Sequence, residues 1–395
     1  MRSANVSEMS ERSVPPRDPA TRAVHPPRPP VRQEPLVAPL YGTSVFTFPG
    51  LEEMDDAFRQ PDSFVYSRME NPNSHALGQQ IAALEGAEAG LAVSSGQAAT
   101  FLAVEAAAQE AGTLHYAHHL YGGTLDLIVH EIGRRRRIEP FDAWGGPPPE
   151  LARGDAVLVE SLSNPSCRPS PLRSLARACR EAGATLVVDN TFATPVSCRP
   201  LLRGAELVVH SLTKAISGHA HVILGAVAGR ADLVREAARL KARLGMVADP
   251  RAAWLALEGA KTLFVRQERA VANATWLAGH LARHPAVAQV SHPSLLEDLS
   301  WRQDLILPGS LLAFDVGTMA RASQFTRALR LIALAPSLGD VATTISHPGL
   351  SSHRGLDSQG QAAIGVTPGL IRLSVGIEQV EDIWADLSQA LEQLP

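Results

Sequence analysis

Residues 74–262 alternate between helical periodicity and short apolar runs, and this alternation restricts the possible folds more than any other feature of the chain. Three of the apolar runs have the length of a strand and end in polar residues, namely AVLVES, TLVVDN and AELVVHS. Helical stretches lie between them, and the stretch PLRSLARACREAGA closes near a glycine, as helices often do. Strands that alternate with helices predict an α/β domain with a mainly parallel sheet.

The rest of the chain divides into three further regions. Residues 263–395 begin with a long helical pattern, continue with the short strands SLLAFDVG and LIRLSVG, and end in a second helical pattern, which predicts a smaller C-terminal α/β domain. Residues 1–36 are rich in Pro, Arg and Ser, cannot bury a core, and predict a disordered tail. Residues 37–73 contain no long helical pattern and are expected to form an arm between the tail and the domain of residues 74–262.

The composition excludes several classes of function. The 395 residues are 45% hydrophobic and carry a net charge of −4, which fits a globular protein without a basic surface for nucleic acid. No apolar run is long enough to span a membrane, and the N-terminus lacks the apolar region of a signal peptide. Cys167, Cys179 and Cys198 have no metal-ligand spacing and predict reduced thiols in the cytoplasm. The imidazoles of HYAHH (115–119) have no carboxylate or cysteine partner at metal spacing, so no metal site is expected.

A lysine flanked by two hydroxyls follows the third apolar run, in the tetrapeptide Ser211-Leu212-Thr213-Lys214. The amine can form an imine with a cofactor aldehyde, and the hydroxyls can hydrogen-bond a phosphate. An isolated lysine is usually a solvated surface residue, but Asp189 ends the strand upstream. A carboxylate beside a pyridinium nitrogen keeps that nitrogen protonated and the ring an electron sink. Together these residues indicate pyridoxal 5'-phosphate (PLP).

From about Val37 to the C-terminus the chain resembles the PLP-dependent transsulfuration enzymes of Cys/Met metabolism, which include methionine γ-lyase, cystathionine γ-lyase, cystathionine γ-synthase and the homoserine-ester sulfhydrylases. The matching blocks are APLYGTSVFTF (38–48), YSRMENPN (66–73), LEGAEAGLAVSSGQAA (84–99), LYGGT (120–124), ESLSNP (160–165), VVDNTFATP (187–195), HSLTKAISGH (210–219), EGAKTL (258–263), SLGD (337–340), HPGLSSH (347–353) and IRLSVGIE (371–378). The resemblance implies the aspartate aminotransferase-like fold (fold type I), with a large PLP-binding domain and a smaller C-terminal domain.

The resemblance also implies where the cofactor phosphate binds. Gly96 and Gln97 open a helix directly after a strand, and backbone amides at a helix N-terminus form an anion site. The family uses this turn, usually with methionine in place of Gln97, together with hydroxyls that match Ser211 and Thr213.

Four further residues match those that hold the cofactor ring. Lys214 matches the Schiff-base lysine, and Asp189 matches the partner of the ring nitrogen. Asn164 matches the asparagine that hydrogen-bonds the phenolic oxygen. Tyr121 matches the tyrosine that stacks on the ring, where its hydroxyl can exchange protons with the substrate amine or the leaving group.

The remaining matches concern the neighbouring subunit and the substrate. In the family, the arm that matches residues 37–73 contacts the neighbouring subunit, and Tyr66 and Arg68 match a pair that crosses this dimer interface to the phosphate of the other subunit. Arg372 matches the arginine that binds the substrate α-carboxylate bidentately, and Ser337 assists it. The resemblance thus implies a homodimer as the minimal unit and a homotetramer as the full assembly.

The chain departs from the family pattern near several of these blocks. The departures are Asn73 for threonine, Ala215 for an aromatic residue, His221 for aspartate, Glu258 for arginine and Ala342 for glutamate. Because the cofactor ligands are kept, these departures concern the choice of substrate rather than the use of PLP.

The segment before Leu338 bears on the substrate. Members that use cystathionine typically have Glu-Ser-Leu-Gly, and the glutamate can meet a distal ammonium, whereas this chain has Pro336 at the glutamate position. Asp340 resembles methionine γ-lyase-type members, but Gly123 stands where the methionine lyases have cysteine. We therefore expect γ-elimination from an L-amino acid. The alternative is γ-replacement, as in cystathionine γ-synthase or a homoserine-ester sulfhydrylase, and a non-catalytic PLP-binding relative is the remaining possibility.

Overall fold

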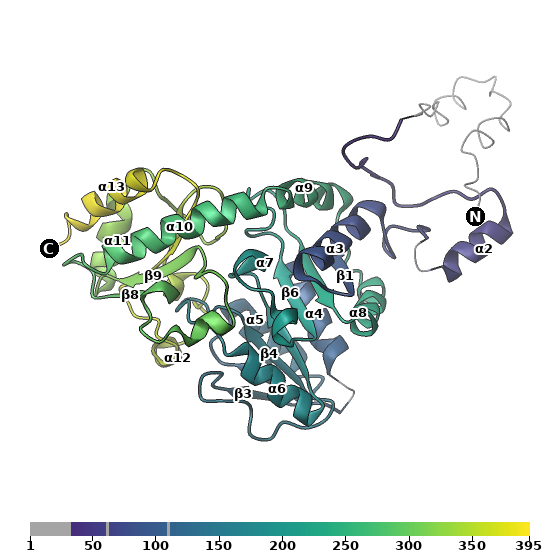
Figure 1. Ribbon diagram of the computed structural model, residues 1–395, viewed down its shortest axis with the longest axis horizontal. Helices are drawn as coiled ribbons and strands as arrows, with labels where there is room; N and C mark the ends of the chain where they lie inside the picture. Colours follow the sequence, from purple (N-terminus) through teal and green to yellow (C-terminus); the bar gives the residue numbers. More distant parts are fainter. Residues whose placement is uncertain (1–32, 61–62, 109–110) are drawn as a thin grey trace.

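The computed structural model describes residues 33–60, 63–108 and 111–395. Its larger sheet has seven strands in the order β1-β7-β6-β5-β4-β2-β3 (Figure 1). The strands are β1 (Ala89–Val93), β2 (Leu114–Ala117), β3 (Ile138–Phe141), β4 (Ala156–Glu160), β5 (Thr185–Asp189), β6 (Leu207–Ser211) and β7 (Gly225–Gly229). Strands β3, β2, β4, β5 and β6 pair in parallel, whereas β7 is antiparallel to β6 and β1. The mainly parallel sheet expected from the sequence is confirmed.

Helices pack against this sheet. Helix α3 (Pro72–Glu85) contacts β1 and β7, α4 (Gly96–Ala107) lies across β5, β6 and β7, and α6 (Leu172–Ala182) contacts β5. The other helical segments of this region are α5 (Gly122–Leu127), a π-helical turn (Ile128–Ile132), α7 (Thr194–Ser197), a 3-10 turn (Pro200–Arg203), α8 (Ala231–Leu244) and α9 (Pro250–Ala260). Gly183 follows α6 with a φ of 74°, so the glycine in the sequence supplies the left-handed residue that ends this helix.

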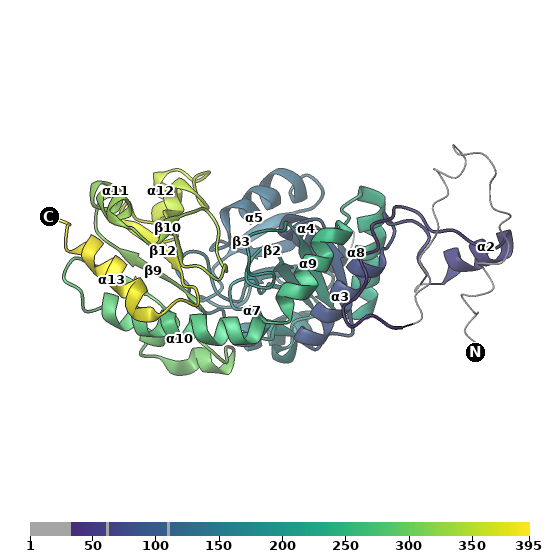
Figure 2. The ribbon, with the colours of Figure 1, turned by 90° about the horizontal axis from the view of Figure 1, so that it is seen from above.

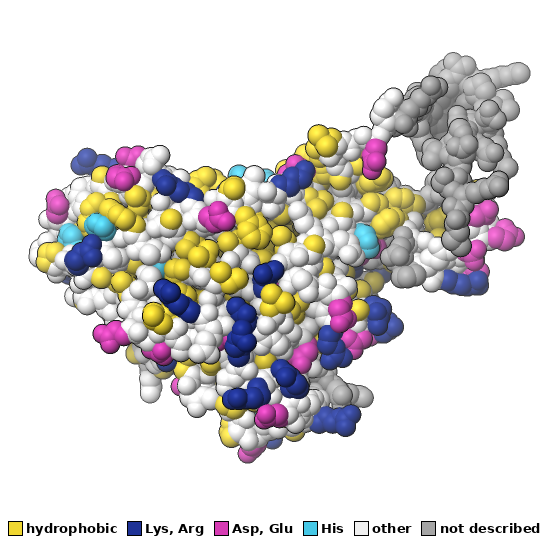
Figure 3. Space-filling view, viewed as in Figure 1, with side chains coloured by type: hydrophobic (Ala, Val, Ile, Leu, Met, Phe, Trp, Pro, Cys, Tyr) yellow, Lys and Arg dark blue, Asp and Glu magenta, His cyan; other side chains and the backbone are white. Residues whose placement is uncertain are grey.

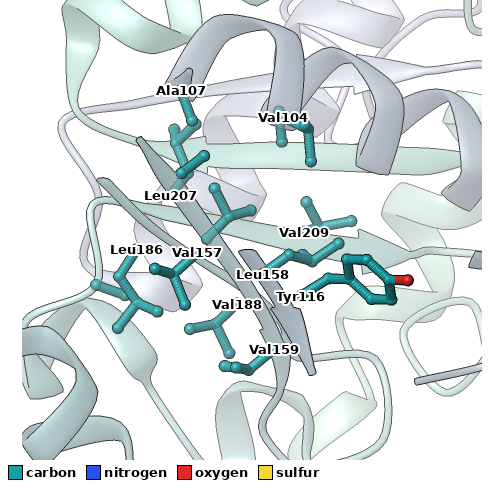
Figure 4. Close-up of a cluster of buried hydrophobic side chains, with 14 of the residues drawn as sticks. Val104, Ala107, Tyr116, Val157, Leu158, Val159, Leu186, Val188, Leu207 and Val209 are labelled. Carbon is teal, nitrogen blue, oxygen red and sulfur yellow. The ribbon is translucent and has the colours of Figure 1, made fainter. Parts of the chain in front are cut away.

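The central strands form the main core of the molecule. Every residue of β4 is buried, and the apolar residues of β5 and β6 that Figure 4 labels have no exposed surface. Val104 and Ala107 of α4 pack over them in the same cluster (Figure 4). Near-continuous apolar runs are typical of parallel strands, because helices cover both faces of such a sheet.

A second, smaller sheet lies toward the C-terminus, with the order β10-β11-β12-β9-β8. Its strands are β8 (Gln289–Ser291), β9 (Leu311–Asp315), β10 (Ala333–Leu334), β11 (Thr344–Ser346) and β12 (Leu370–Ser374). The helical segments are α10 (Leu263–Leu281), α11 (Met319–Ala328), α12 (Ser358–Ala363), α13 (Val380–Leu391) and 3-10 turns at Pro293–Leu295, Leu299–Gln303 and Pro348–Leu350. Phe314, Phe325 and Leu387 belong to a separate core beneath this sheet. The smaller α/β domain is thus confirmed. Helix α10 begins at Leu263, where the sequence places the domain boundary, and that boundary stays a prediction.

The segment before α3 extends away from the two sheets (Figures 1 and 2). It carries α2 (Leu51–Arg59), a helix with no buried residue. Asn73 attaches the base of this segment, because its Oδ1 accepts from the amide of Tyr41 at 2.8 Å and its Nδ2 donates to the carbonyl of Pro39 at 2.8 Å. The departure at Asn73 therefore has a structural role. Of the tail predicted over residues 1–36, all but 33–36 lie outside the described residues.

Hydrophobic side chains are exposed along the extended segment and over the adjoining body, on the face drawn in Figure 3. Leu51, Met54 and Phe58 of α2 are among the exposed residues. Across the described residues, no helix has both the length and the apolar character needed to cross a membrane.

Candidate active site

A cavity of about 560 Å³ lies beyond the carboxyl ends of β4, β5 and β6. Glu160, Asp189 and Ser211 end these three strands, and each of them lines the cavity. Residues 336–338, 350–352 and Arg372 close it from the side of the smaller sheet. Ligands of open α/β sheets bind at the carboxyl ends of parallel strands, so this cavity is the candidate active site.

Lys214 lies in this cavity, three residues beyond the end of β6. Its Nζ donates a hydrogen bond to Oγ of Ser337 at 3.1 Å. Burial lowers the pKa of the Lys214 amine, and the nearby charge of Arg372 lowers it further. A lowered pKa increases the fraction of neutral amine, which is the form that attacks an aldehyde.

The carboxylate of Asp189 fits a pyridinium partner. Its Oδ1 accepts from the amide of Thr191 at 2.9 Å, which fixes the orientation of the carboxylate. Burial raises the pKa of Asp189 in spite of this hydrogen bond. A cation against the carboxylate would offset the cost of burying its charge, and a protonated ring nitrogen is such a cation.

The predicted phosphate site is a compact turn. Ser95 caps α4 by accepting from the amide of Ala98 at 3.1 Å, and the amides of Gly96 and Gln97 precede that capped position. A Cβ on Gly96 would lie 2.8 Å from Cβ of Ser211, so only glycine allows this helix start to approach the end of β6. An anion at this turn would meet a helix N-terminus and the Ser211 hydroxyl.

Thr213 also lines the cavity, but its hydroxyl is engaged elsewhere. Its Oγ1 donates to the carbonyl of Leu224 at 3.2 Å and accepts from the amide of Leu224 at 3.1 Å. Contact between Thr213 and a phosphate therefore remains a prediction that requires this hydroxyl to change its donor bond.

Tyr121 and Asn164 lie in the cavity and are joined by Glu160, which the sequence interpretation did not single out. One carboxylate oxygen of Glu160 accepts from the amide of Tyr121 at 2.7 Å, and the other accepts from the amide of Asn164 at 3.0 Å. Burial and the neighbouring Asp189 raise the pKa of Glu160 well above its usual range. Glu160 is thus a buried residue that positions the backbone of its neighbours. Its place at the end of β4, in register with Asp189 on β5, is the feature from which the sequence could have indicated this role.

Arg372 is buried at the wall of the cavity, on strand β12. Its Nη1 donates to Oδ1 of Asn164 at 3.0 Å, and its Nη2 donates to the carbonyl of Ser337 at 3.2 Å. Its Nε is buried and has no hydrogen-bond partner among the described residues. Burial lowers the pKa of the guanidinium to about 10. Because Oδ1 of Asn164 accepts from Arg372, the side-chain NH₂ of Asn164 can donate to another acceptor in the cavity.

The segment after Lys214 is held by Arg266, a second buried residue that the sequence did not indicate. Its guanidinium donates to the carbonyls of Ala215, Ile216 and Gly259 at 2.7, 3.1 and 2.7 Å. An arginine in the first turn of a helical pattern gives no sign of this role, because two of its acceptors, Ala215 and Ile216, lie about 50 residues away along the chain. A Cβ on Gly339 would lie 2.4 Å from the amide nitrogen of Ala215, so the SLGD turn packs directly on the same segment.

Tyr66 and Arg68 do not reach the cavity of their own chain. Arg68 donates to the carbonyl of Ala242 at 2.7 Å, and its guanidinium lies over the Tyr66 ring at 5.7 Å. Tyr66 is exposed on the side of the extended segment. Their predicted contact with a phosphate therefore requires a second copy of the chain.

The structure brings a carboxylate to the HYAHH segment that the sequence spacing did not show. Ligand atoms of His118, His119 and Asp142 lie within 4.8 Å of one another, since β2 and β3 end side by side. Burial lowers the pKa of His119 to about 4, and the charge of Arg168 disfavours a cation there. Burial also raises the pKa values of the thiols of Cys167 and Cys179 to about 12, which disfavours a nucleophilic thiolate.

Three of the departures from the family pattern lie outside the cavity. Glu258 forms an ion pair with Lys261 at 2.6 Å within one turn of helix. His221 is exposed, and its ring lies 5.5 Å from that of His219. Ala342 donates its amide to Asp340 Oδ1 at 2.9 Å in the SLGD turn.

The fold and the cavity define the class of a PLP-dependent enzyme of fold type I. The sequence pattern of the family described as "Cys/Met metabolism PLP-dependent enzyme" matches residues 20–392, so the chain belongs to this family, and its cofactor is PLP.

Similar proteins have related activities. L-methionine gamma-lyase of Pseudomonas putida is 36% identical over 368 residues, which cover 90% of this chain and 92% of that protein. O-acetyl-L-homoserine sulfhydrylase 1 of Thermus thermophilus is 36% identical over 402 residues, which cover 89% and 94%.

Solved structures agree with the fold. A putative O-acetylhomoserine (thiol)-lyase of Campylobacter jejuni, which carries a pyridoxyl-lysine phosphate, superposes with a TM-score of 0.86 at 29% identity, covering 94% of this chain and 99% of that one. Cystathionine gamma synthase of Xanthomonas oryzae, in complex with cystathionine, superposes with a TM-score of 0.84 at 34% identity, covering 90% and 93%.

Proposed function

We propose that this PLP enzyme eliminates the γ-substituent of an L-amino acid, and the distribution of charge in the cavity carries the proposal. Glu160 and Asp189 are the only acidic residues among those that line it within the described chain, and both lie at the strand ends. Both accept hydrogen bonds from backbone amides. Pro336 supplies no carboxylate at the wall. A second amino acid such as cysteine would therefore bring an ammonium without a partner, which is costly in a desolvated site.

Four polar side chains of the cavity have a part in this reaction, namely Arg372, Ser337, Lys214 and Tyr121. Arg372 binds the substrate α-carboxylate, with Ser337 beside it, and this orients the α-hydrogen toward Lys214. The Lys214 amine takes the proton from Cα and moves a proton from Cβ, because its lowered pKa leaves it available as a base. Bound PLP supplies an electron sink for the bonds broken at Cα and Cβ. The hydroxyl of Tyr121 exchanges a proton with the substrate amine or the leaving group.

The overall reaction balances with water alone. The Cγ–X bond breaks and X leaves with the bonding electron pair, while one water releases the remaining carbon chain as 2-oxobutanoate and ammonium. The nearest alternative is γ-replacement, in which a nucleophile takes the place of X. The 36% identity with the sulfhydrylase relative supports this alternative. Sulfide as the nucleophile would fit this cavity, because it is small and carries no ammonium group.

The test uses the PLP-loaded protein with methionine, γ-halo amino acids and homoserine esters, each alone, with cysteine and with sulfide. We expect 2-oxobutanoate and ammonia from at least one donor alone. Efficient formation of cystathionine, or of homocysteine with little oxo acid, would replace elimination by γ-replacement. No product from any donor, with PLP bound, would favour a non-catalytic relative.

We also propose that the active site is shared between two chains in a dimer, which pairs further into a tetramer in the cytoplasm. Its support is the exposed arm with Tyr66 and Arg68, which cannot reach the cavity of its own chain. Mixed Arg68→Ala and Lys214→Ala chains should recover part of the activity through hybrid dimers. Sedimentation should give at least a dimer, and hybrids that form without any recovered activity would contradict the shared site.

A further inference from the structure

One charged residue of the cavity has no part in the proposed reaction. Within the described part of the chain, five charged side chains line it, namely Glu160, Asp189, Lys214, Arg354 and Arg372. Four of them are assigned above to cofactor, substrate carboxylate or the positioning of neighbours. Arg354 is the fifth, and it is exposed, so it lies at the mouth of the cavity rather than at its floor.

The guanidinium of Arg354 forms no ion pair and no hydrogen bond with any of the described residues. The backbone amide of Arg354 donates a hydrogen bond to the carbonyl of Ser351 at 3.4 Å. Its neighbours at the mouth are the partly exposed Ser351 and Ser352 and the exposed Leu350. An arginine that faces a ligand cavity with its five donors unused is suited to a phosphate or carboxylate.

The backbone that carries Arg354 is fixed to the rest of the site. The preceding residue, His353, is fully buried, and its Nε2 lies 3.2 Å from the carbonyl of Leu120. Gln361 donates to the carbonyls of Gly349, His353 and Leu356 at 3.1 to 3.2 Å. A Cβ on Gly122 would lie 2.0 Å from the carbonyl oxygen of Ser352, so this loop packs directly on the turn of Tyr121. The guanidinium therefore extends from a rigid base beside the catalytic residues.

We propose that Arg354 binds an anionic γ-substituent of the substrate and makes the enzyme prefer L-homoserine esters of a dibasic acid, such as the phosphate or succinate ester, over neutral substrates. The proposal rests on the proposed function, since Arg372 must hold the α-carboxylate for the γ-substituent to point toward the mouth. When the Cγ–O bond breaks, the oxygen keeps the electron pair, and Arg354 stabilises the added negative charge of the departing phosphate or dicarboxylate.

The kinetic test compares O-phospho-, O-succinyl- and O-acetyl-L-homoserine with the PLP-loaded enzyme. Arg354→Ala should lower the ratio of kcat/KM for an anionic ester over the acetyl ester by roughly 10- to 100-fold, the range for a hydrogen bond to a charged group. Arg354→Lys should keep part of the preference. The matched control is Arg327→Ala, an exposed arginine of α11 in the same domain, which should leave the ratio unchanged.

A binding measurement gives an independent result without turnover. The probes are L-2-amino-5-phosphonopentanoate, in which a methylene replaces the ester oxygen, and neutral norvaline, both titrated against the PLP absorbance. Arg354→Ala should weaken the phosphonate roughly 10- to 100-fold and norvaline by less than about twofold. An unchanged phosphonate affinity, or an unchanged kinetic ratio, would overturn the role of Arg354. Loss of turnover with every ester in the wild type would instead contradict the proposed function, and the binding result would still decide the role of Arg354.

Discussion

Replacing Arg372 by alanine is expected to remove most of the amino acid specificity of the site. The guanidinium is buried, and burial lowers its pKa from 12.5 to about 10. At about 1.4 kcal/mol per pKa unit, this corresponds to about 3 kcal/mol by which the unliganded site disfavours the positive charge. A substrate carboxylate would relieve this cost. Truncating one member of a buried charge pair costs about 2 to 5 kcal/mol, a range that includes this value.

The assay follows 2-oxo acid release and the PLP absorbance in parallel. Arg372→Ala should lower kcat/KM by a factor of about 30 to 5,000, which is the same free energy expressed as a rate. PLP should stay bound, since Asp189 and Lys214 are unchanged. The free energy of unfolding of the unliganded protein should fall little, because the variant also removes a buried charge that forms no ion pair with a carboxylate of the described residues. Unchanged kcat/KM in a variant that is folded and loaded with PLP would refute the assignment of Arg372.

Other changes test the remaining site residues. Borohydride reduction of the PLP-loaded protein should attach the cofactor to Lys214, and a label on another lysine in the peptide map would contradict its role. Arg266→Met should lower the free energy of unfolding by about 3 kcal/mol or more in denaturant titrations, because three buried carbonyls lose a charged donor. A decrease of less than about 1 kcal/mol would contradict the role of Arg266 in stabilising the segment after Lys214. The raised pKa of Glu160 means that the folded protein holds a proton that the unfolded chain releases, so the stability of the cofactor-free protein should fall as the pH rises above about 4.5, and Glu160→Gln should reduce this slope in urea titrations. Gly123→Cys should displace the ring of Tyr121, whose Cε1 lies 2.5 Å from the position of an added Cβ, and a crystal structure with an unmoved ring would be the contrary result.

The strand ends could be predicted from the sequence, because carboxyl ends of parallel strands meet at one edge of a sheet. Asp189 and Ser211 follow apolar runs of strand length, and the structure places both in the cavity. The carboxylate of Asp142 beside His118 could have been inferred by the same rule, had the pairing of β2 with β3 been anticipated.

The buried supports of the site could not be predicted in this way. Glu160 and Arg266 act on backbone groups of segments that only the tertiary fold brings near, and neither the residue type nor its local pattern identifies those partners. The contacts expected of Tyr66 and Arg68 depend on a second chain, so a single copy leaves them predictions.

The two faces of the cavity come from different parts of the chain. The residues expected to hold the cofactor within one chain lie between positions 96 and 214, whereas those facing the substrate lie at 336–337, 350–354 and 372. In the second group, Arg372 lies on β12 of the smaller sheet, which has its own core. Evolution can therefore alter the substrate preference of such a protein through the final third of its chain, while the cofactor-binding part is conserved. A chimera that exchanges only that third between two relatives should have the substrate range of the relative that supplies its C-terminal part.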